Sequence, residues 1–187
     1  MSNIDKVELI AYTDASYDQK RSIAGWGVVL QIKKKGVTKE HAFRNYLPCS
    51  SNNYAELFAI HQALILLAGN KHRTTHNGSD AKIIIYTDSQ TALDYLNGLR
   101  GKEYQDRHMP RWTKEQYMEH KRMSLLTYKI KKICNSDVEY RKVKGHCKDY
   151  QEEHLENNLA DGYAKIGRSL YYKNNPRLIM KGKDYEK

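Results

Sequence analysis

Two segments of the chain share a pattern in which an apolar run stops abruptly at an aspartate. The first run covers residues 6–13 and ends at Asp14, and the second covers residues 81–87 and ends at Asp88. A near-continuous apolar run is typical of a strand that is buried on both faces of a sheet. Both runs close with Tyr-Thr-Asp, so we expect two carboxylates side by side at one edge of a sheet. Like charges held so close require a cation between them.

The residues between these two runs predict two more strands and a helix. Residues 24–32 and 37–47 have strand patterns and are joined by a Lys-Lys-Lys-Gly turn, which gives an antiparallel meander with the first strand. Gly25 and Gly27 indicate either close approach of a neighbour or ligand, or a bulge. Apolar residues at helical spacing then predict a helix over residues 53–68.

The second half of the chain completes an α/β fold with the element order βββαβαβα. The expected elements are a short helix from Ser89 to Asn97, a basic and irregular segment up to Thr113, a long helix, a strand over residues 137–144 and a helix from about Leu155. The last helix is expected to bury Leu159, Tyr163, Ile166 and Leu170 on one face.

Length and composition favour a single domain inside the cell. The chain has 187 residues, enough for one full core. No apolar run approaches the ~20 residues of a membrane helix, and the first residues lack the form of a signal peptide, so we expect a cytoplasmic protein, with no membrane partner, that acts as a monomer. The three cysteines are irregularly spaced, which favours reduced thiols over a zinc site.

The charge points to a polyanionic partner. Lys and Arg total 32 against 22 Asp and Glu, a formal net charge of +10. A basic protein that keeps acidic residues at its strand ends is suited to holding a nucleic acid and acting on it with metal ions. The alternative is that the charge serves solubility alone.

Four acidic residues, Asp14, Glu56, Asp88 and Asp161, lie where this element order can bring them to one end of the sheet. Their mutual repulsion would be resolved by hard, oxygen-preferring divalent ions such as Mg²⁺ or Mn²⁺. Two such ions about 4 Å apart can hold the attacking water and the leaving oxygen of a phosphodiester. Helix capping is the competing interpretation for two of them, Glu56 as the partner of Asn53 in a capping box and Asp88 at the start of the short helix.

Five motifs in order resemble type 1 ribonuclease H: Tyr12-Thr-Asp-Ala-Ser16, Asn52-Asn-Tyr-Ala-Glu-Leu57, Tyr86-Thr-Asp-Ser-Gln90, Val143-Lys-Gly-His146 and Asn157-Asn-Leu-Ala-Asp161. Each motif alone is weak, but five on matching elements are specific. The resemblance implies a five-stranded mixed sheet flanked by helices. It also implies Mg²⁺-dependent hydrolysis of the RNA strand of RNA–DNA hybrids, leaving 3′-hydroxyl and 5′-phosphate ends.

The resemblance also assigns the site. It implies that Asp14, Glu56, Asp88 and Asp161 bind two Mg²⁺ ions, with Mn²⁺ as a possible substitute. Asp14 should bridge both ions, Glu56 and Asp88 complete one site, and Asp161 holds the other. His146 corresponds to a mobile histidine that helps the product leave or shuttles a proton. The turn after His146 is longer and more acidic than is usual in the family, so His154 or one of its acids is the alternative.

The same resemblance implies contacts to the hybrid. The residues expected to touch nucleic acid are Ser16, Lys20, Asn52, Gln90, Arg107, Arg111, Trp112 and Asn157. Three of them belong to a basic insert over residues 99–132, in the position of a protrusion that grips the DNA strand in some members. The expected organisation is a catalytic domain over residues 1–172 and a basic tail over residues 173–187.

Two other functions compete with hybrid cleavage. A nuclease of the same fold that acts on DNA junctions or on RNA alone would leave Asn52 and Gln90 without a 2′-hydroxyl to contact. A non-catalytic module that binds hybrid or RNA is disfavoured, because all four carboxylates are present.

Overall fold

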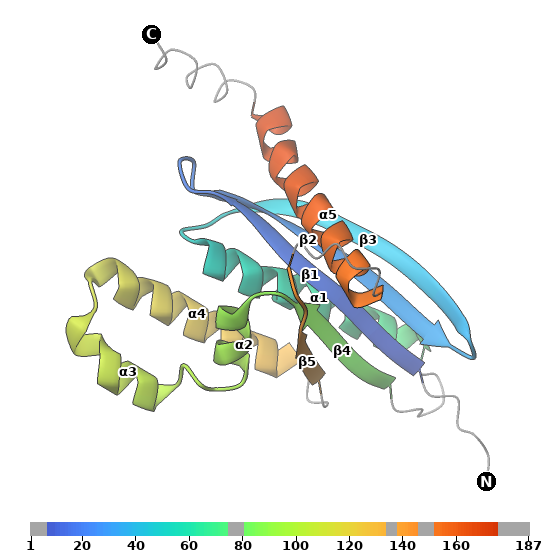
Figure 1. Ribbon diagram of the computed structural model, residues 1–187, viewed down its shortest axis with the longest axis horizontal. Coiled ribbons are helices and arrows are strands. Elements are labelled where there is room, and N and C mark those ends of the chain that lie inside the picture. The colour runs from blue at the N-terminus through green and yellow to red at the C-terminus, as the bar shows by residue number, and fades with distance from the viewer. Residues whose placement is uncertain (1–6, 75–80, 134–137, 146–151, 176–187) are drawn as a thin grey trace.

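The computed structural model describes residues 7–74, 81–133, 138–145 and 152–175, and its centre is one five-stranded mixed sheet (Figure 1). The strands are β1 (Val7–Asp18), β2 (Ile23–Lys34), β3 (Val37–Pro48), β4 (Ala81–Thr87) and β5 (Val138–Lys142), in the spatial order β3-β2-β1-β4-β5. The first three are antiparallel, whereas β4 and β5 run parallel to β1. The predicted α/β fold with a mixed sheet is therefore confirmed.

β1 is the central strand and is longer than its apolar run predicted. It pairs in parallel with β4 only up to the Thr13–Thr87 pair. Its antiparallel pairing with β2 continues through Asp14 to Asp18. The predicted strand end at Asp14 is therefore wrong, because β2 still satisfies the backbone there. Asp14 lies instead where β1 loses its parallel neighbour, so its side chain stands beside the end of β4.

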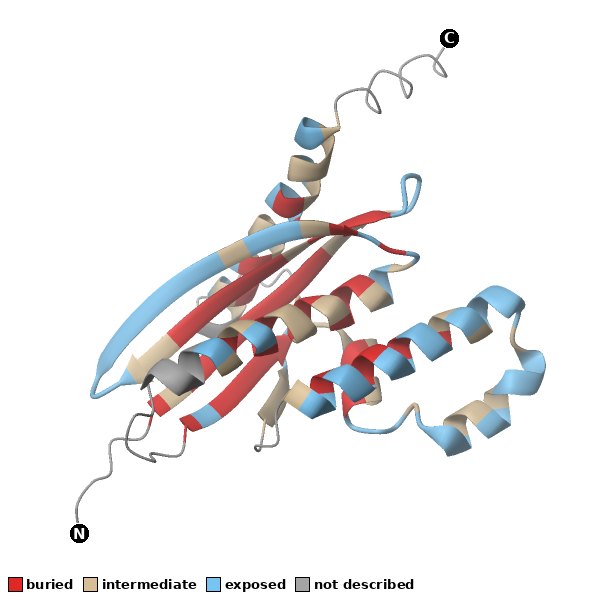
Figure 2. Ribbon diagram, turned by 180° about the vertical axis from the view of Figure 1, so that it is seen from behind, coloured by how far each residue is buried: buried red, intermediate tan, exposed pale blue. Residues whose placement is uncertain are grey.

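Helices cover both faces of the sheet. α1 (Asn52–Thr74) and α4 (Lys114–Ile133) lie on one face, and α5 (Glu152–Asn174) crosses the other (Figure 1). Alternate residues of β1 serve the two cores: Leu9 packs with the apolar side chains of α1 and α4, whereas Tyr12 packs with Ala160 of α5. Both faces of β1 are thus buried, as Figure 2 shows in red and as its apolar run predicted. β3 is exposed along most of its length, as expected for an edge strand.

The segment between β4 and α4 is more regular than its sequence suggested. After α2 (Gln90–Leu96) it forms α3 (Lys102–His108) and the 3₁₀ turn η1 (Met109–Arg111). No residue of α3 is buried, and α3 projects away from the sheet with the start of α4 (Figure 1). Its sequence lacks an apolar stripe because the helix contacts no core, so periodicity could not reveal it.

α5 packs through small residues, which corrects the predicted buried stripe. Leu159 and Ile166 are 47% and 45% exposed, whereas Ala160 and Ala164 are fully buried. A Cβ atom at Gly25 would lie 2.0 Å from the carbonyl oxygen of Ala164. The helix therefore rests directly on the backbone of β2, an approach that larger residues would prevent. Of the interpretations of the two strand glycines, close approach of a neighbour is the correct one.

None of the helices in the described parts of the chain combines the length and the apolar character needed to cross a membrane. Residues 176–187, most of the predicted basic tail, and Asp137 at the start of the predicted fifth strand lie outside the described residues. The division into a catalytic domain and a tail stays a prediction.

Candidate active site

Parallel pairing brings two aspartates together at one edge of the sheet. β1 and β4 are in register at Tyr12–Tyr86 and Thr13–Thr87, so the next residue on each strand is an aspartate. The Thr13 hydroxyl donates to the carbonyl oxygen of Tyr86 at 3.2 Å and supports this register. The repeated Tyr-Thr-Asp motif thus places Asp14 beside Asp88 for a purely geometric reason.

Glu56 reaches the same place from helix α1. It lies in the second turn of α1 and is 5% exposed. The competing interpretation of Glu56, as the partner of Asn53 in a capping box, does not hold, since Ser51 caps this helix: its hydroxyl accepts from the backbone N–H of Tyr54 at 3.2 Å. The Glu56 carboxylate is therefore not needed as a cap. It accepts a hydrogen bond from Asn52 Nδ2 at 3.4 Å through Oε1.

Asp14, Glu56 and Asp88 each offer a carboxylate oxygen, and these atoms all lie within 4.8 Å of one another. We call these three residues the acidic cluster. Burial, and then the charge of Asp88, raise the pKa of Asp14 to about 7 from its ordinary 3.8. Burial, followed by the charges of Asp14 and Asp88, raises the pKa of Glu56 well above its usual range. Burial and mutual repulsion thus oppose the ionisation of these carboxyl groups unless a cation stands between them.

The acidic cluster fits a hard divalent cation. All of its donor atoms are carboxylate oxygens, the ligands that Mg²⁺ and Mn²⁺ prefer. Glu56 Oε2 is buried and has no hydrogen-bond partner among the described residues, a costly arrangement unless another group supplies the missing interaction. A cation held between the three carboxylates would satisfy this oxygen and relieve the repulsion.

Asp161 lies close to the acidic cluster, but its carboxylate is already paired with a lysine side chain. Its negative charge is among the causes that raise the pKa of Asp14. Its Oδ2 pairs at 2.6 Å with Lys165 Nζ, one turn further along α5. The sequence predicts four carboxylates without a basic residue between them. The structure brings three together and adds Lys165, which i,i+4 spacing on the last helix would have revealed.

Some of the residues expected to contact nucleic acid have exposed side chains. Lys20 is exposed at the turn between β1 and β2, and Asn52 and Gln90 are exposed at the starts of α1 and α2. Ser16 is partly buried two residues beyond Asp14, on the same face of β1. Asn157 is 1% exposed, and its Oδ1 has no hydrogen-bond partner among the described residues.

The basic insert carries exposed cations and an aromatic group. Arg107 on α3 and Arg111 on η1 are exposed. Trp112 is partly buried, with its ring centroid 4.8 Å from that of His120 and 6.0 Å from that of Tyr104. Trp112 therefore packs within a ring cluster, which limits the face it offers to a nucleic acid.

The two candidate histidines differ in what the structure says of them. His146 lies outside the described residues. His154, its alternative, is partly buried on the first turn of α5. The role of His146, with His154 as its alternative, stays a prediction. The monomeric state and the cytoplasmic location also stay predictions.

Comparisons with known proteins agree with this fold. The sequence model of the RNase H family matches residues 6–169. A search of curated proteins found no match. Among solved structures, LC9-RNase H1, a type 1 RNase H with the type 2 active-site motif, is 20% identical with a TM-score of 0.61, over 90% of this chain and 75% of that one.

Two further structures are similar over nearly their whole length. RNase H1 from the archaeon Halobacterium salinarum is 20% identical with a TM-score of 0.57, over 86% of this chain and 96% of that one. LC11-RNase H1 in complex with RNA/DNA hybrid is 20% identical with a TM-score of 0.58, over 87% of this chain and 98% of that one. At this level of identity all three likenesses concern the fold alone.

The fold and the acidic cluster define an α/β protein with carboxylates gathered beside the end of a parallel strand pair. The family match covers most of the sequence. The chain belongs to the RNase H family, and it is a ribonuclease H enzyme.

Proposed function

We propose that this ribonuclease H hydrolyses the RNA strand of RNA–DNA hybrids by a two-metal mechanism and leaves 3′-hydroxyl and 5′-phosphate ends. The observation that carries the proposal is the acidic cluster, three carboxylates from β1, α1 and the end of β4 with oxygens within 4.8 Å of one another. Family membership and a structural neighbour solved with RNA/DNA hybrid support the choice of substrate. The net charge of +10 supports a polyanionic partner.

In this proposal the four acidic residues together coordinate two metal ions. Asp14, Glu56 and Asp88 would hold one ion, and Asp161 together with Asp14 would contribute to a second. When bound, two Mg²⁺ or Mn²⁺ ions would activate the attacking water and stabilise the charge on the leaving oxygen. Lys165 must release Asp161 for the second site to form. A histidine, His146 or His154, would assist departure of the product.

The protein surface around the cluster would hold and select the hybrid. The amide groups of Asn52 and Gln90 can both donate and accept hydrogen bonds, as contact with a 2′-hydroxyl in the wide minor groove requires. Arg107 and Arg111, both exposed on the insert, would contact phosphates of the paired DNA strand. Asn157 is buried, so in this proposal it does not touch the substrate directly.

The central experiment replaces Asp88 by Asn, which keeps the shape and removes the charge. We expect Mg²⁺-dependent cleavage to fall by more than about a hundredfold, whereas hybrid binding, measured by fluorescence anisotropy, survives. Asp106→Asn, the same change at an exposed position of α3, should retain cleavage and leave hybrid binding unchanged or tighter. Normal cleavage by Asp88→Asn would remove Asp88 from the site.

A substrate panel separates the proposal from its rivals. Labelled hybrid, duplex RNA, duplex DNA and single strands are incubated with Mg²⁺, with Mn²⁺ or with EDTA. Hybrid cleaved only in the RNA strand, and only with a divalent ion, is the expected result. Cleavage of DNA or of unpaired RNA would favour the junction or RNA nuclease, and hybrid left intact with every ion would favour a binding module.

A further inference from the structure

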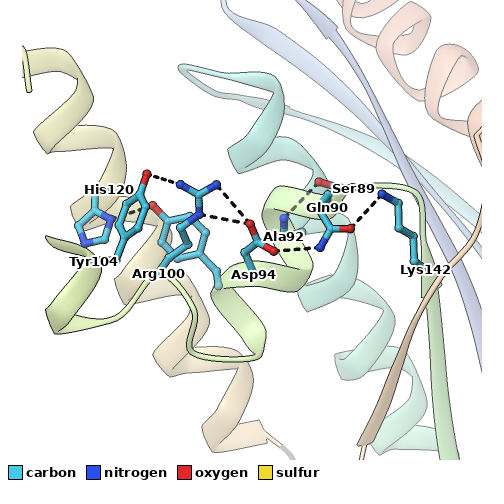
Figure 3. Close-up of polar contacts among 9 residues, drawn as sticks. Ser89, Gln90, Ala92, Asp94, Arg100, Tyr104, His120 and Lys142 are labelled. Atoms are coloured by element: carbon cyan, nitrogen blue, oxygen red, sulfur yellow. Dashed lines mark hydrogen bonds and ion pairs between the residues drawn. The ribbon is translucent and has the colours of Figure 1, made fainter. Parts of the chain in front are cut away.

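A continuous chain of polar contacts connects the sheet edge with the projecting insert (Figure 3). Lys142 Nζ, at the end of β5, donates to Gln90 Oε1 at 2.9 Å. Gln90 Nε2 donates to Asp94 Oδ1 at 2.9 Å, one turn further along α2. The other oxygen of Asp94 accepts from Arg100 Nε at 3.3 Å and from Arg100 Nη2 at 3.2 Å. Arg100 Nη1 in turn donates to the Tyr104 hydroxyl on α3.

The neighbours of Gln90 permit only one orientation of its amide. Lys142 is a pure donor, so it must face the amide oxygen. The Asp94 carboxylate accepts and does not donate, so it must face the amide nitrogen. A flipped amide would place donor against donor and acceptor against acceptor. The exposed Gln90 side chain is therefore held with a defined donor edge and a defined acceptor edge.

Asp94 is the residue at which the two halves of this chain of contacts meet. One oxygen serves Gln90, and the other serves Arg100 in a two-point contact. The Arg100 guanidinium also lies over the Tyr104 ring, 4.4 Å from its centroid. The Tyr104 ring is 4.3 Å from His108 and 6.0 Å from Trp112 by centroid. Asp94 thus fixes a side chain beside the proposed active site and also the base of the insert.

We propose that Asp94 is a positioning residue, which holds the Gln90 amide in one orientation and ties the insert to it, so that the two bind one hybrid together. This inference rests on the proposed function, in which Gln90 and the insert contact the substrate. An acidic residue beside a polyanion is unfavourable by charge alone. Its favourable contribution therefore has to come from the groups that it orients.

The sign of the effect separates positioning from simple electrostatics. Removing a negative charge from a protein that binds nucleic acid should tighten binding. We expect the opposite for Asp94→Ala: KM for hybrid rises about five- to tenfold, as for the loss of one hydrogen bond to a charged group, with kcat changed less than about twofold. Asp106→Ala removes the same charge from an exposed position of α3 and should lower KM or leave it unchanged.

A double-mutant cycle tests whether Asp94 acts through Gln90. In the Gln90→Ala background, Asp94→Ala should raise KM by less than about twofold, because the group that it orients is already gone. Asp94→Glu keeps two acceptor oxygens and should remain within about threefold of the wild-type KM. Melting temperatures of all variants establish that they are folded, and Asp94→Asn replaces Asp94→Ala if the latter is not.

A spectroscopic readout tests the same contact without substrate. The side-chain amide resonances of Gln90, assigned by their loss in Gln90→Ala, should shift in Asp94→Ala and stay unchanged in Asp106→Ala. Unshifted resonances, or equal KM effects of Asp94→Ala in both backgrounds, would overturn the inference. A wild-type protein that cleaves no hybrid would instead overturn the proposed function, and the amide resonances would still decide whether Asp94 orients Gln90.

Discussion

Gly145 lies directly against the carboxylate of Asp88. A Cβ atom at Gly145 would be 2.2 Å from Asp88 Oδ2 and 3.2 Å from its Cγ. Real Cβ atoms do not approach other atoms so closely, because van der Waals repulsion is steep at these distances. The glycine that follows β5 therefore leaves room for one of the three carboxylates of the acidic cluster. The sequence analysis noted this glycine only as part of a motif.

Gly145→Ala should displace the Asp88 carboxylate and weaken metal binding. We expect the Mg²⁺ concentration for half-maximal cleavage to rise by about tenfold or more, as for the loss of a group that orients a metal ligand. Gly69→Ala is the matched control, since Gly69 lies in α1 with nothing within 4 Å of its Cβ position. An unchanged Mg²⁺ requirement in Gly145→Ala would show that Asp88 has space to move without loss.

Gly27→Ala should push α5 away from its close contact with β2 and destabilise the fold. The new Cβ would lie 2.1 Å from the carbonyl oxygen of Ala160 and 2.6 Å from the backbone nitrogen of Ala164. Backbone atoms cannot rotate away, so the helix must shift, and we expect a loss of at least about 2 kcal/mol in unfolding free energy. Urea denaturation measures this loss. Gly162→Ala, on α5 itself but with nothing within 4 Å, should cost no stability, and equal losses in the two variants would contradict the packing described.

Metal-free protein should lose stability as the pH rises from about 4 to about 7. The pKa of Asp14 is about 7 in the folded chain against an ordinary 3.8, so the folded state holds a proton that the unfolded state releases. A group of this kind favours folding at low pH, and the benefit disappears as the pH passes through the folded pKa. Thermal melting in EDTA, compared between wild type and Asp14→Asn, isolates this contribution from the other carboxylates.

Saturating Mg²⁺ provides the matching test of the same residue. A bound divalent ion requires deprotonated carboxylates, so it should remove this loss of stability at neutral pH in the wild type. Asp14→Asn should gain much less from Mg²⁺. The same dependence on pH in both proteins would indicate that Asp14 does not titrate between these values.

Lys165→Gln should raise the affinity of the site for Mg²⁺. The ammonium group of Lys165 pairs with Asp161 and also lowers the pKa of Asp14, so it competes with a cation for the same negative charge. We expect a several-fold lower Mg²⁺ concentration for half-maximal cleavage, measured beside Lys173→Gln, an exposed lysine of the last turn of α5. A higher Mg²⁺ requirement would show that Lys165 supports the site.

Much of the core was predictable because its signal is local. The apolar runs before Asp14 and Asp88 identified the central strand pair, and the shared Tyr-Thr-Asp motif predicted that the two carboxylates would meet. Parallel register then brings them together without any further information from the chain. The sequence placed Glu56 near the start of a helix, but it could not distinguish a metal ligand from a cap, because both use an acid at that position.

Contacts between distant segments decided the rest. The packed face of α5 is set by glycines of β2, not by the helix's own large apolar residues, so periodicity selected the wrong stripe. The place of Gly145 beside Asp88 depends on atoms that only folding brings together. The cap at Ser51 and the pairing of Lys165 with Asp161 are local contacts, which spacing in the sequence could have revealed. The sequence by itself determined which strands are central and which acids follow them, since burial leaves a repeating pattern. Distances of a few ångströms between side chains leave no such pattern, and the tertiary structure alone decided them.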